Sequence, residues 1–206
     1  MTFDGLKPLA YQLMGERKAH LSREKGGIYC HGERVAKTVV SLRKLVLPHD
    51  SSWDERLKIA ALFHDIGKGV EPHEKYGPVI AREALKPFFG AAELDEICDL
   101  IARHCARSPE NNDYSDYLKL LQDADMLDHF GTYNIWTDFW YSAYTERTLV
   151  NTAFYESDHW NNECKKNRSL LNYDISKSIF DEKITFINNF YIRLQAECKG
   201  EIYDLG

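Results

Sequence analysis

Apolar residues recur at every third or fourth position along most of the chain, the spacing that places them on one face of an α-helix. One such stripe consists of Val35, Val39, Leu42 and Val46. The nearest approach to a β-strand is the short run 145–150, so we predict an all-α fold. The predicted helices cover about residues 8–21, 29–47, 76–89, 92–106 and 176–198, with one more beginning after 52 and one near 115.

Polar residues and glycines between these stripes predict where helices begin and end. Ser52 and Glu55 have the spacing of a capping box, in which each side chain bonds the other residue's backbone N–H. Gly67 follows the third helix and fits the left-handed conformation that ends many helices. The polar stretch 161–172 is predicted to be a loop.

The stretch from 130 to 160 is rich in aromatic residues. Tyr133, Trp136, Trp140 and Tyr144 follow one another at helical spacing and form a single stripe. This stripe fits packing against a core or the face of a homodimer. It also fits a cap over a binding site, because aromatic rings stack on bases and other rings.

Composition places the chain among ordinary globular proteins. Its 206 residues suffice for one domain with a sizeable core, and 44% of them are hydrophobic and 28% charged. The net charge of −6 provides no basic field for a nucleic-acid backbone, so no extended nucleic-acid surface is expected. A phosphorylated substrate would have to be held locally, by metal ions and a few cationic side chains.

The cysteines and the N-terminus indicate a cytoplasmic protein. The first residues show no signal peptide, and no apolar stretch is long enough to span a membrane. An odd number of cysteines without a CxxC motif is typical of reduced thiols in the cytosol. They are Cys30, Cys98, Cys105, Cys164 and Cys198.

Candidate metal ligands stand in or beside the predicted helices. His64 and Asp65 are adjacent at the end of the third helix. A His-Asp dipeptide without further ligands is more typical of a helix end with a buried histidine than of a metal site. Imidazole and carboxylate donors suit Mn, Fe, Co, Ni or Zn, and two such ions can activate a water and hold a phosphoryl group. The further candidates are His31, His73, His104 and Asp125.

In their order along the chain these residues resemble the motifs of the HD superfamily of metal-dependent hydrolases. The run His64-Asp65-Ile66-Gly67-Lys68 matches the HDIG variant of the motif. The resemblance implies a single HD-type domain over 1–206, a helical bundle with its motif core at about 28–131 and additional C-terminal helices at about 132–206. It also rests on His31-Gly32-Glu33-Arg34-Val35-Ala36, His73-Glu74-Lys75-Tyr76-Gly77 and Asp123-Ala124-Asp125-Met126-Leu127-Asp128.

The resemblance also implies a ligand set for one or two divalent ions. Asp65 would bridge to a second ion bound by His73 and His104. Asp123 and His129 are near enough to leave the assignment of the last ligand open. The implied ligands are His31, His64, Asp65, His73, His104 and Asp125.

The resemblance gives catalytic roles to Asp65 and Lys68, and spacing on the predicted helices suggests roles for Arg34, one turn from His31, and Asp128, one turn after Asp125. Asp65 and Lys68 would be catalytic, and Lys68 would bind the substrate phosphate or assist proton transfer. Arg34 would contact the phosphate, or else form a salt bridge with a nearby glutamate, Glu33 or Glu74. Asp128 would orient a ligand or a water.

The function implied is metal-dependent phosphohydrolysis of a nucleotide or a small phosphate mono- or diester. Two alternatives remain. One is a di-iron oxygenase of the inositol oxygenase type, which also uses four histidine and two aspartate ligands, and the other is a non-catalytic nucleotide-sensing HD domain. Cyclic dinucleotides are not expected as substrates. The HD-GYP subgroup that cleaves them usually carries two adjacent histidines where this chain has His104-Cys105, and its GYP signature is not found here.

Overall fold

The computed structural model describes residues 1–108, 113–154 and 157–203. Within these ranges every regular element is a helix, which confirms the all-α prediction, and none of these helices is long and apolar enough to cross a membrane. The helices are α1 (Phe3–Met14), α2 (Gly27–Val46), α3 (Asp54–Phe63), α4 (His73–Leu85), α5 (Ala91–Arg103), α6 (Asp116–Asp128), α7 (Thr132–Tyr144), α8 (Leu149–Ala153), α9 (Ser157–Ser169) and α10 (Asp174–Cys198).

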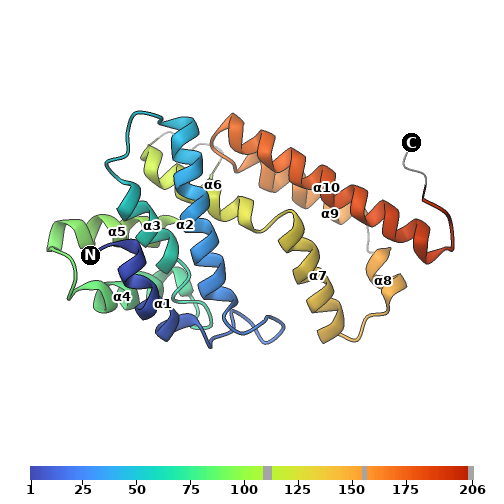
Figure 1. Ribbon diagram of the computed structural model, residues 1–206, viewed down its shortest axis with the longest axis horizontal. Helices are drawn as coiled ribbons and strands as arrows, with labels where there is room; N and C mark the ends of the chain where they lie inside the picture. Colours follow the sequence, from blue (N-terminus) through green and yellow to red (C-terminus); the bar gives the residue numbers. More distant parts are fainter. Residues whose placement is uncertain (109–112, 155–156, 204–206) are drawn as a thin grey trace.

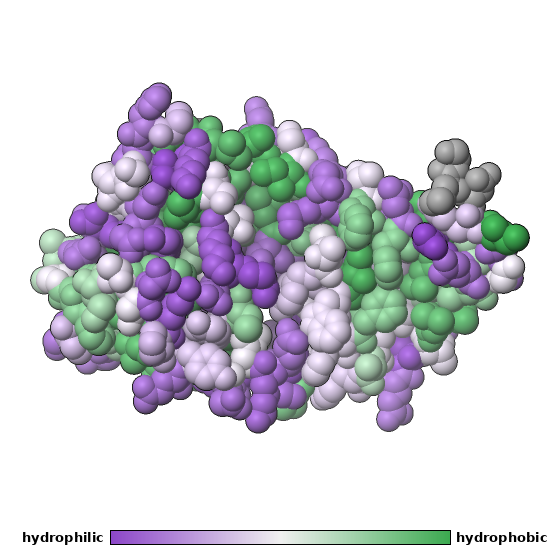
Figure 2. Space-filling model, viewed as in Figure 1, coloured by the Kyte–Doolittle hydropathy of each residue, from purple (hydrophilic) through white to green (hydrophobic). Residues whose placement is uncertain are grey.

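Helices α1 to α6 form a bundle, and α7 to α10 extend from it as an arm (Figure 1). Helix α10 contacts α2 and α6 in the bundle and α7, α8 and α9 in the arm, so it joins the two parts. On the face shown in Figure 2, apolar side chains gather on the arm.

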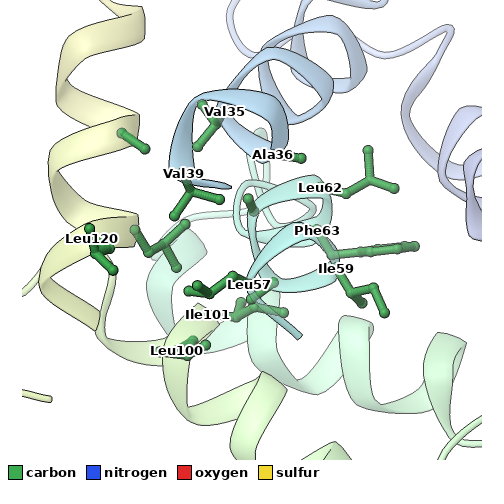
Figure 3. Close-up of a cluster of buried hydrophobic side chains, with 14 of the residues drawn as sticks. Val35, Ala36, Val39, Leu57, Ile59, Leu62, Phe63, Leu100, Ile101 and Leu120 are labelled. Carbon is green, nitrogen blue, oxygen red and sulfur yellow. The ribbon is translucent and has the colours of Figure 1, made fainter. Parts of the chain in front are cut away.

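The pair α2 and α3 lies at the centre of the bundle. Val35 and Val39 of α2 face Leu57 of α3, with side chains of α5 and α6 beside them, and these residues are buried (Figure 3). The two helices approach closely because Gly32 has no side chain. A Cβ at that position would lie 2.5 Å from the backbone oxygen of Leu62. This contact brings the beginning of α2 against the end of α3, where His64 stands.

The turns that follow α3 are held by a side chain that bonds to their backbone carbonyls. Arg17 donates from its guanidinium to the carbonyls of Ile66, at 2.8 Å, and Lys68, at 2.6 Å. The predicted left-handed conformation of Gly67 is wrong, since in the turns after α3 it is Gly69 that has a positive φ, at 86°. Gly67 is needed for a different reason. A Cβ there would lie 2.6 Å from the carbonyl oxygen of His73.

The predicted capping box at the start of α3 is also wrong. Trp53 is the N-cap, and the Ser52 hydroxyl donates to the Asp50 carboxylate at 2.6 Å instead. The Glu55 carboxylate accepts from the backbone N–H of Phe3 at 2.8 Å. Glu55 therefore ties the beginning of α1 to α3, a long-range contact that takes precedence over the local motif.

The arm corrects one prediction for the C-terminal half and confirms another. Most of the polar stretch 161–172, predicted as a loop, lies in α9. Contacts with α10 support this helix, because Trp160 donates from Nε1 to Asn188 at 3.1 Å. The run 145–150 forms no strand, and Thr148 instead caps the short helix α8 by accepting from the N–H of Asn151.

The aromatic stripe of α7 does not pack into the core. Trp136, Trp140 and Tyr144 are 49%, 36% and 54% exposed, so the core-packing interpretation is wrong for them. A homodimer face on these residues stays a prediction. Tyr133 faces inward, as the following subsection describes.

We predict that Gly32→Ala destabilises the protein by about 1–3 kcal/mol, the usual cost of overpacking, because its methyl group meets the fixed backbone of Leu62. Urea denaturation measures the change. Gly5→Ala is the matched control. Gly5 also lies inside a helix, but the close neighbour of its Cβ would be the flexible side chain of Met1 at 2.8 Å, with the Thr2 hydroxyl at an ordinary 3.5 Å, and alanine favours the helix. Equal midpoints for the two variants would contradict a steric role for Gly32.

Candidate metal centre

The structure brings together all six residues that the sequence analysis named as ligands. They come from five different places in the bundle: the second turn of α2, the end of α3, the first residue of α4 and the ends of α5 and α6. All are buried except His73, which is partly buried. They are His31, His64, Asp65, His73, His104 and Asp125.

One half of the centre lies between α2, α3 and α6. The Nε2 atoms of His31 and His64 are 3.2 Å apart. Oδ1 of Asp125 is 3.0 Å from Nε2 of His31 and 3.5 Å from Nε2 of His64. Oδ2 of Asp65 completes this group, at 3.9 Å and 3.7 Å from the same two nitrogens.

The other half of the centre is on the opposite side of the Asp65 carboxylate. Oδ1 of Asp65 lies 3.6 Å from Nε2 of His104 and 3.8 Å from Nε2 of His73. Nζ of Lys68 is also 3.8 Å from this oxygen. The two oxygens of Asp65 therefore face two different pairs of histidines.

Three of the histidines are oriented by a hydrogen bond from the other ring nitrogen. Nδ1–H of His64 donates to the carbonyl of Ala61, and Nδ1–H of His104 donates to the carbonyl of Ile101, both at 2.6 Å. Nδ1–H of His31 donates to the Asp128 carboxylate at 2.7 Å. Because these acceptors cannot donate, each Nδ1 carries a proton, and each Nε2 is directed at the centre, where its lone pair becomes available when its own proton leaves.

This convergence of lone pairs and carboxylates creates a site for positive charge. Burial disfavours a charged imidazolium, yet Asp125 and Asp128 raise the pKa of His31 to about 9. Burial also disfavours the charged form of His104, but its hydrogen bond with Asp65 raises its pKa to about 10. Burial would raise the pKa of the Asp65 carboxyl, but His64, His104 and His31 hold it well below its usual range. A divalent cation satisfies the same donors without protons.

Two residues that sequence reasoning missed support the last ligand. Arg107 donates to Oδ2 of Asp125, the oxygen that faces away from His31. The buried Gln122 donates to the carbonyls of Arg103 and Ala106, both at 3.1 Å, and so holds the end of α5 against α6. Arg107 follows the end of α5, where periodicity no longer predicts direction.

The two alternative ligands near Asp125 lie in different positions relative to the centre. Asp123 is directed away from the centre, and its Oδ1 accepts from the backbone and side-chain N–H groups of Asn172, at 2.9 Å and 2.8 Å. Its role is to hold the segment that leads into α10. His129 does reach the centre, since its Nε2 is 3.3 Å from Oδ1 of Asp125.

Arg34 pairs with neither of the glutamates considered from the sequence. Its Nη2 donates to Asp128 at 2.8 Å, and its guanidinium lies 4.1 Å from the ring centre of Tyr133. Glu33 is directed toward Lys7 of α1, at 3.1 Å. Burial opposes ionisation of Asp128, but His31 and Arg34 lower its pKa to about 2. A direct contact of Arg34 or Asp128 with substrate stays a prediction.

A cavity of about 820 Å³ opens beside the centre, between the bundle and the arm. His31, Asp65, Lys68 and His129 line it on the bundle side. Helices α7, α9 and α10 supply most of the opposite wall, where aromatic rings alternate with amide groups. Its lining there includes Tyr133, Asn134, Tyr141, Trp160, Asn161, Asn167, Asn188, Tyr191 and Gln195.

Comparison with known proteins agrees with this geometry. A family model of the HD domain matches residues 28–129, which run from the first turn of α2 to the residue after α6 and include every ligand candidate.

The chain belongs to the HD superfamily.

Solved structures with HD folds resemble the chain along nearly its whole length. An HD-superfamily hydrolase from Bacillus thuringiensis is 20% identical, with a TM-score of 0.72, and the match covers 97% of each chain. The structure of Bacillus subtilis YpgQ in complex with ADP is 17% identical, with a TM-score of 0.64, over 95% of this chain and 97% of that one. No curated protein sequence matches. These likenesses cover α7 to α10 as well as the bundle, and confirm an HD helical fold with additional C-terminal helices.

The donor set fits the divalent metals that HD domains bind. Four imidazoles and two carboxylates are typical ligands of first-row transition metals. The hydrogen bonds behind His31, His64 and His104 fix these ligands before a metal arrives.

We predict that Asp128→Asn lowers metal affinity about 10- to 100-fold, the usual effect of removing a group that orients a ligand. The neutral amide would leave the Nδ1–H of His31 without its charged acceptor. Isothermal titration with Mn²⁺ or Co²⁺ measures the change, and circular dichroism checks the fold. The matched control is Asp174→Asn, whose side chain is 99% exposed at the start of α10. An unchanged affinity in Asp128→Asn would show that Asp128 does not orient His31.

Proposed function

We propose that this chain is a metal-dependent phosphohydrolase that acts on a nucleotide or a small phosphate ester, with two divalent ions sharing Asp65. The observation that carries the proposal is the division of the Asp65 carboxylate. One oxygen faces His31 and His64, the other faces His73 and His104, and the centre opens to a cavity with Lys68 at its edge.

Two such ions supply an activated water and a clamp for phosphoryl oxygens. The side chains of this protein would do the rest. Lys68 lines the cavity, and its ammonium is close enough to Asp65 to place a positive charge at the phosphoryl group. Negative charge spreads over the non-bridging oxygens in the transition state of phosphoryl transfer, so a fixed cation there lowers the barrier.

The far wall of the cavity supports a nucleotide as the substrate. Tyr133, Tyr141 and Trp160 provide rings on which a base can stack, and amide groups of Asn161 and Asn188 provide donors and acceptors for its edge. The cavity of about 820 Å³ falls within the usual range for small-molecule sites. A solved HD-fold relative, YpgQ, has been crystallised with ADP.

We predict that the Mn²⁺- or Co²⁺-loaded protein hydrolyses one or more members of a panel of nucleotides and small phosphate esters. The assay is phosphate or nucleotide release, run without oxygen. Chelation should abolish the activity, and readdition of metal should restore it. Asp65→Asn should abolish it with the fold retained, because an amide is neutral and offers one oxygen to two ions. Inactivity across the panel, with O₂ uptake by the iron-loaded form, would favour the di-iron oxygenase instead.

We also predict that Lys68→Ala lowers kcat about 10²- to 10³-fold, the usual effect of removing one positioned group that stabilises transition-state charge. Metal stoichiometry should stay the same, because an ammonium group offers no lone pair to a metal. Lys75→Ala is the control, since Lys75 is exposed on α4 and does not line the cavity. Equal kcat values for the two variants would exclude a catalytic role for Lys68.

A further inference from the structure

A cysteine stands among the donors of the second half of the centre. Sγ of Cys105 is 3.0 Å from Nε2 of His104 and 3.6 Å from Nε2 of His73. The three donor atoms lie within 4.8 Å of one another, so they form a cluster that could hold one metal ion. Oδ1 of Asp65 lies on the same side, 3.6 Å from Nε2 of His104 and 3.8 Å from Nε2 of His73.

These separations match those of ligands around one ion. Metal–nitrogen bonds of about 2.0–2.1 Å and metal–sulfur bonds of about 2.3 Å place tetrahedral neighbours about 3.5 Å apart. The distances from Oδ1 of Asp65 to the two histidine Nε2 atoms are 3.6 and 3.8 Å, and those from Sγ of Cys105 to the same two atoms are 3.0 and 3.6 Å.

A hydrogen bond from the thiol does not account for the cluster. Nδ1–H of His104 is donated to the Ile101 carbonyl, and Nδ1 of His73 lies 3.3 Å from the Glu71 carboxylate, so both Nε2 atoms are directed at the cluster and offer lone pairs once a metal displaces their protons. The thiol has one proton for these two nitrogens and the nearby Asp65 oxygen. A cation bound by all four groups satisfies every lone pair at once.

We propose that Cys105 is a metal ligand, which with Asp65, His73 and His104 forms a sulfur-containing ion site that prefers zinc or cobalt to manganese. Thiolate is a soft ligand, and it shifts preference toward metals that bind sulfur. The opposite half of the centre has only nitrogen and oxygen donors, from His31, His64, Asp65 and Asp125. The two halves therefore differ in the metal they select. This inference rests on the two-ion centre of the proposed function.

Titration of the protein with Co²⁺ tests the proposal by a readout other than activity. A cobalt–thiolate bond gives a charge-transfer band in the near ultraviolet, and elemental analysis gives the number of ions per chain. We expect two cobalt ions and the band in the unmodified protein. Cys105→Ser should lose the band and bind the second ion at least about 10-fold more weakly. Cys105→His should lose the band but keep two ions, because imidazole replaces the thiolate as a ligand.

Cys30→Ser is the matched control. Cys30 is also exposed and also adjacent to a histidine of the centre, but it belongs to no cluster of ligand atoms among the described residues. It should keep the band and both ions. Two cobalt ions without the band, or a band that survives Cys105→Ser, would overturn the role of Cys105 and leave the two-ion centre standing. A single cobalt ion without the band would overturn both.

Discussion

The contact between α2 and α3 at Gly32 is the constraint on which the centre depends. With no side chain at Gly32, the backbone of Leu62 can approach α2, and His31 and His64 come to lie with their Nε2 atoms 3.2 Å apart. Neither helix could provide this pair alone, since the two residues are far apart in sequence. Asp65 follows His64 directly, and His73, His104 and Asp125 join the centre from α4, α5 and α6.

Directing so many lone pairs at one point is electrostatically unfavourable until a cation binds, so the protein must hold the ligands by other means. It does this with hydrogen bonds to the ligand atoms that face away from the centre. Backbone carbonyls hold His64 and His104, a carboxylate holds His31, and a guanidinium holds the outer oxygen of Asp125. Because the ligands are already oriented, metal binding requires little rearrangement of the side chains. Less free energy is lost in ordering them, and the affinity for metal is higher.

The bundle and the arm contribute different chemical groups to the cavity. The bundle supplies ligands and Lys68, whereas α7, α9 and α10 supply the rings and amides across the cavity. Asp123, once a candidate ligand, helps to position this arm by binding Asn172 just before α10. A substrate that contacts both walls would be oriented by one and transformed at the other. Changes in the arm could therefore alter specificity without disturbing the ligands.

The sequence by itself determined the helical class, because apolar spacing along each helix is a local pattern. It named the six candidate ligands through the resemblance of its short motifs to those of the HD superfamily. It failed where distant contacts decide the outcome. Glu55 bonds Phe3 instead of a capping partner, and Gly67 is needed for its approach to His73. Only the tertiary structure placed Arg107 behind Asp125 and Cys105 beside His73, since which side chains meet depends on how separate helices pack. No spacing along one chain segment encodes that distance.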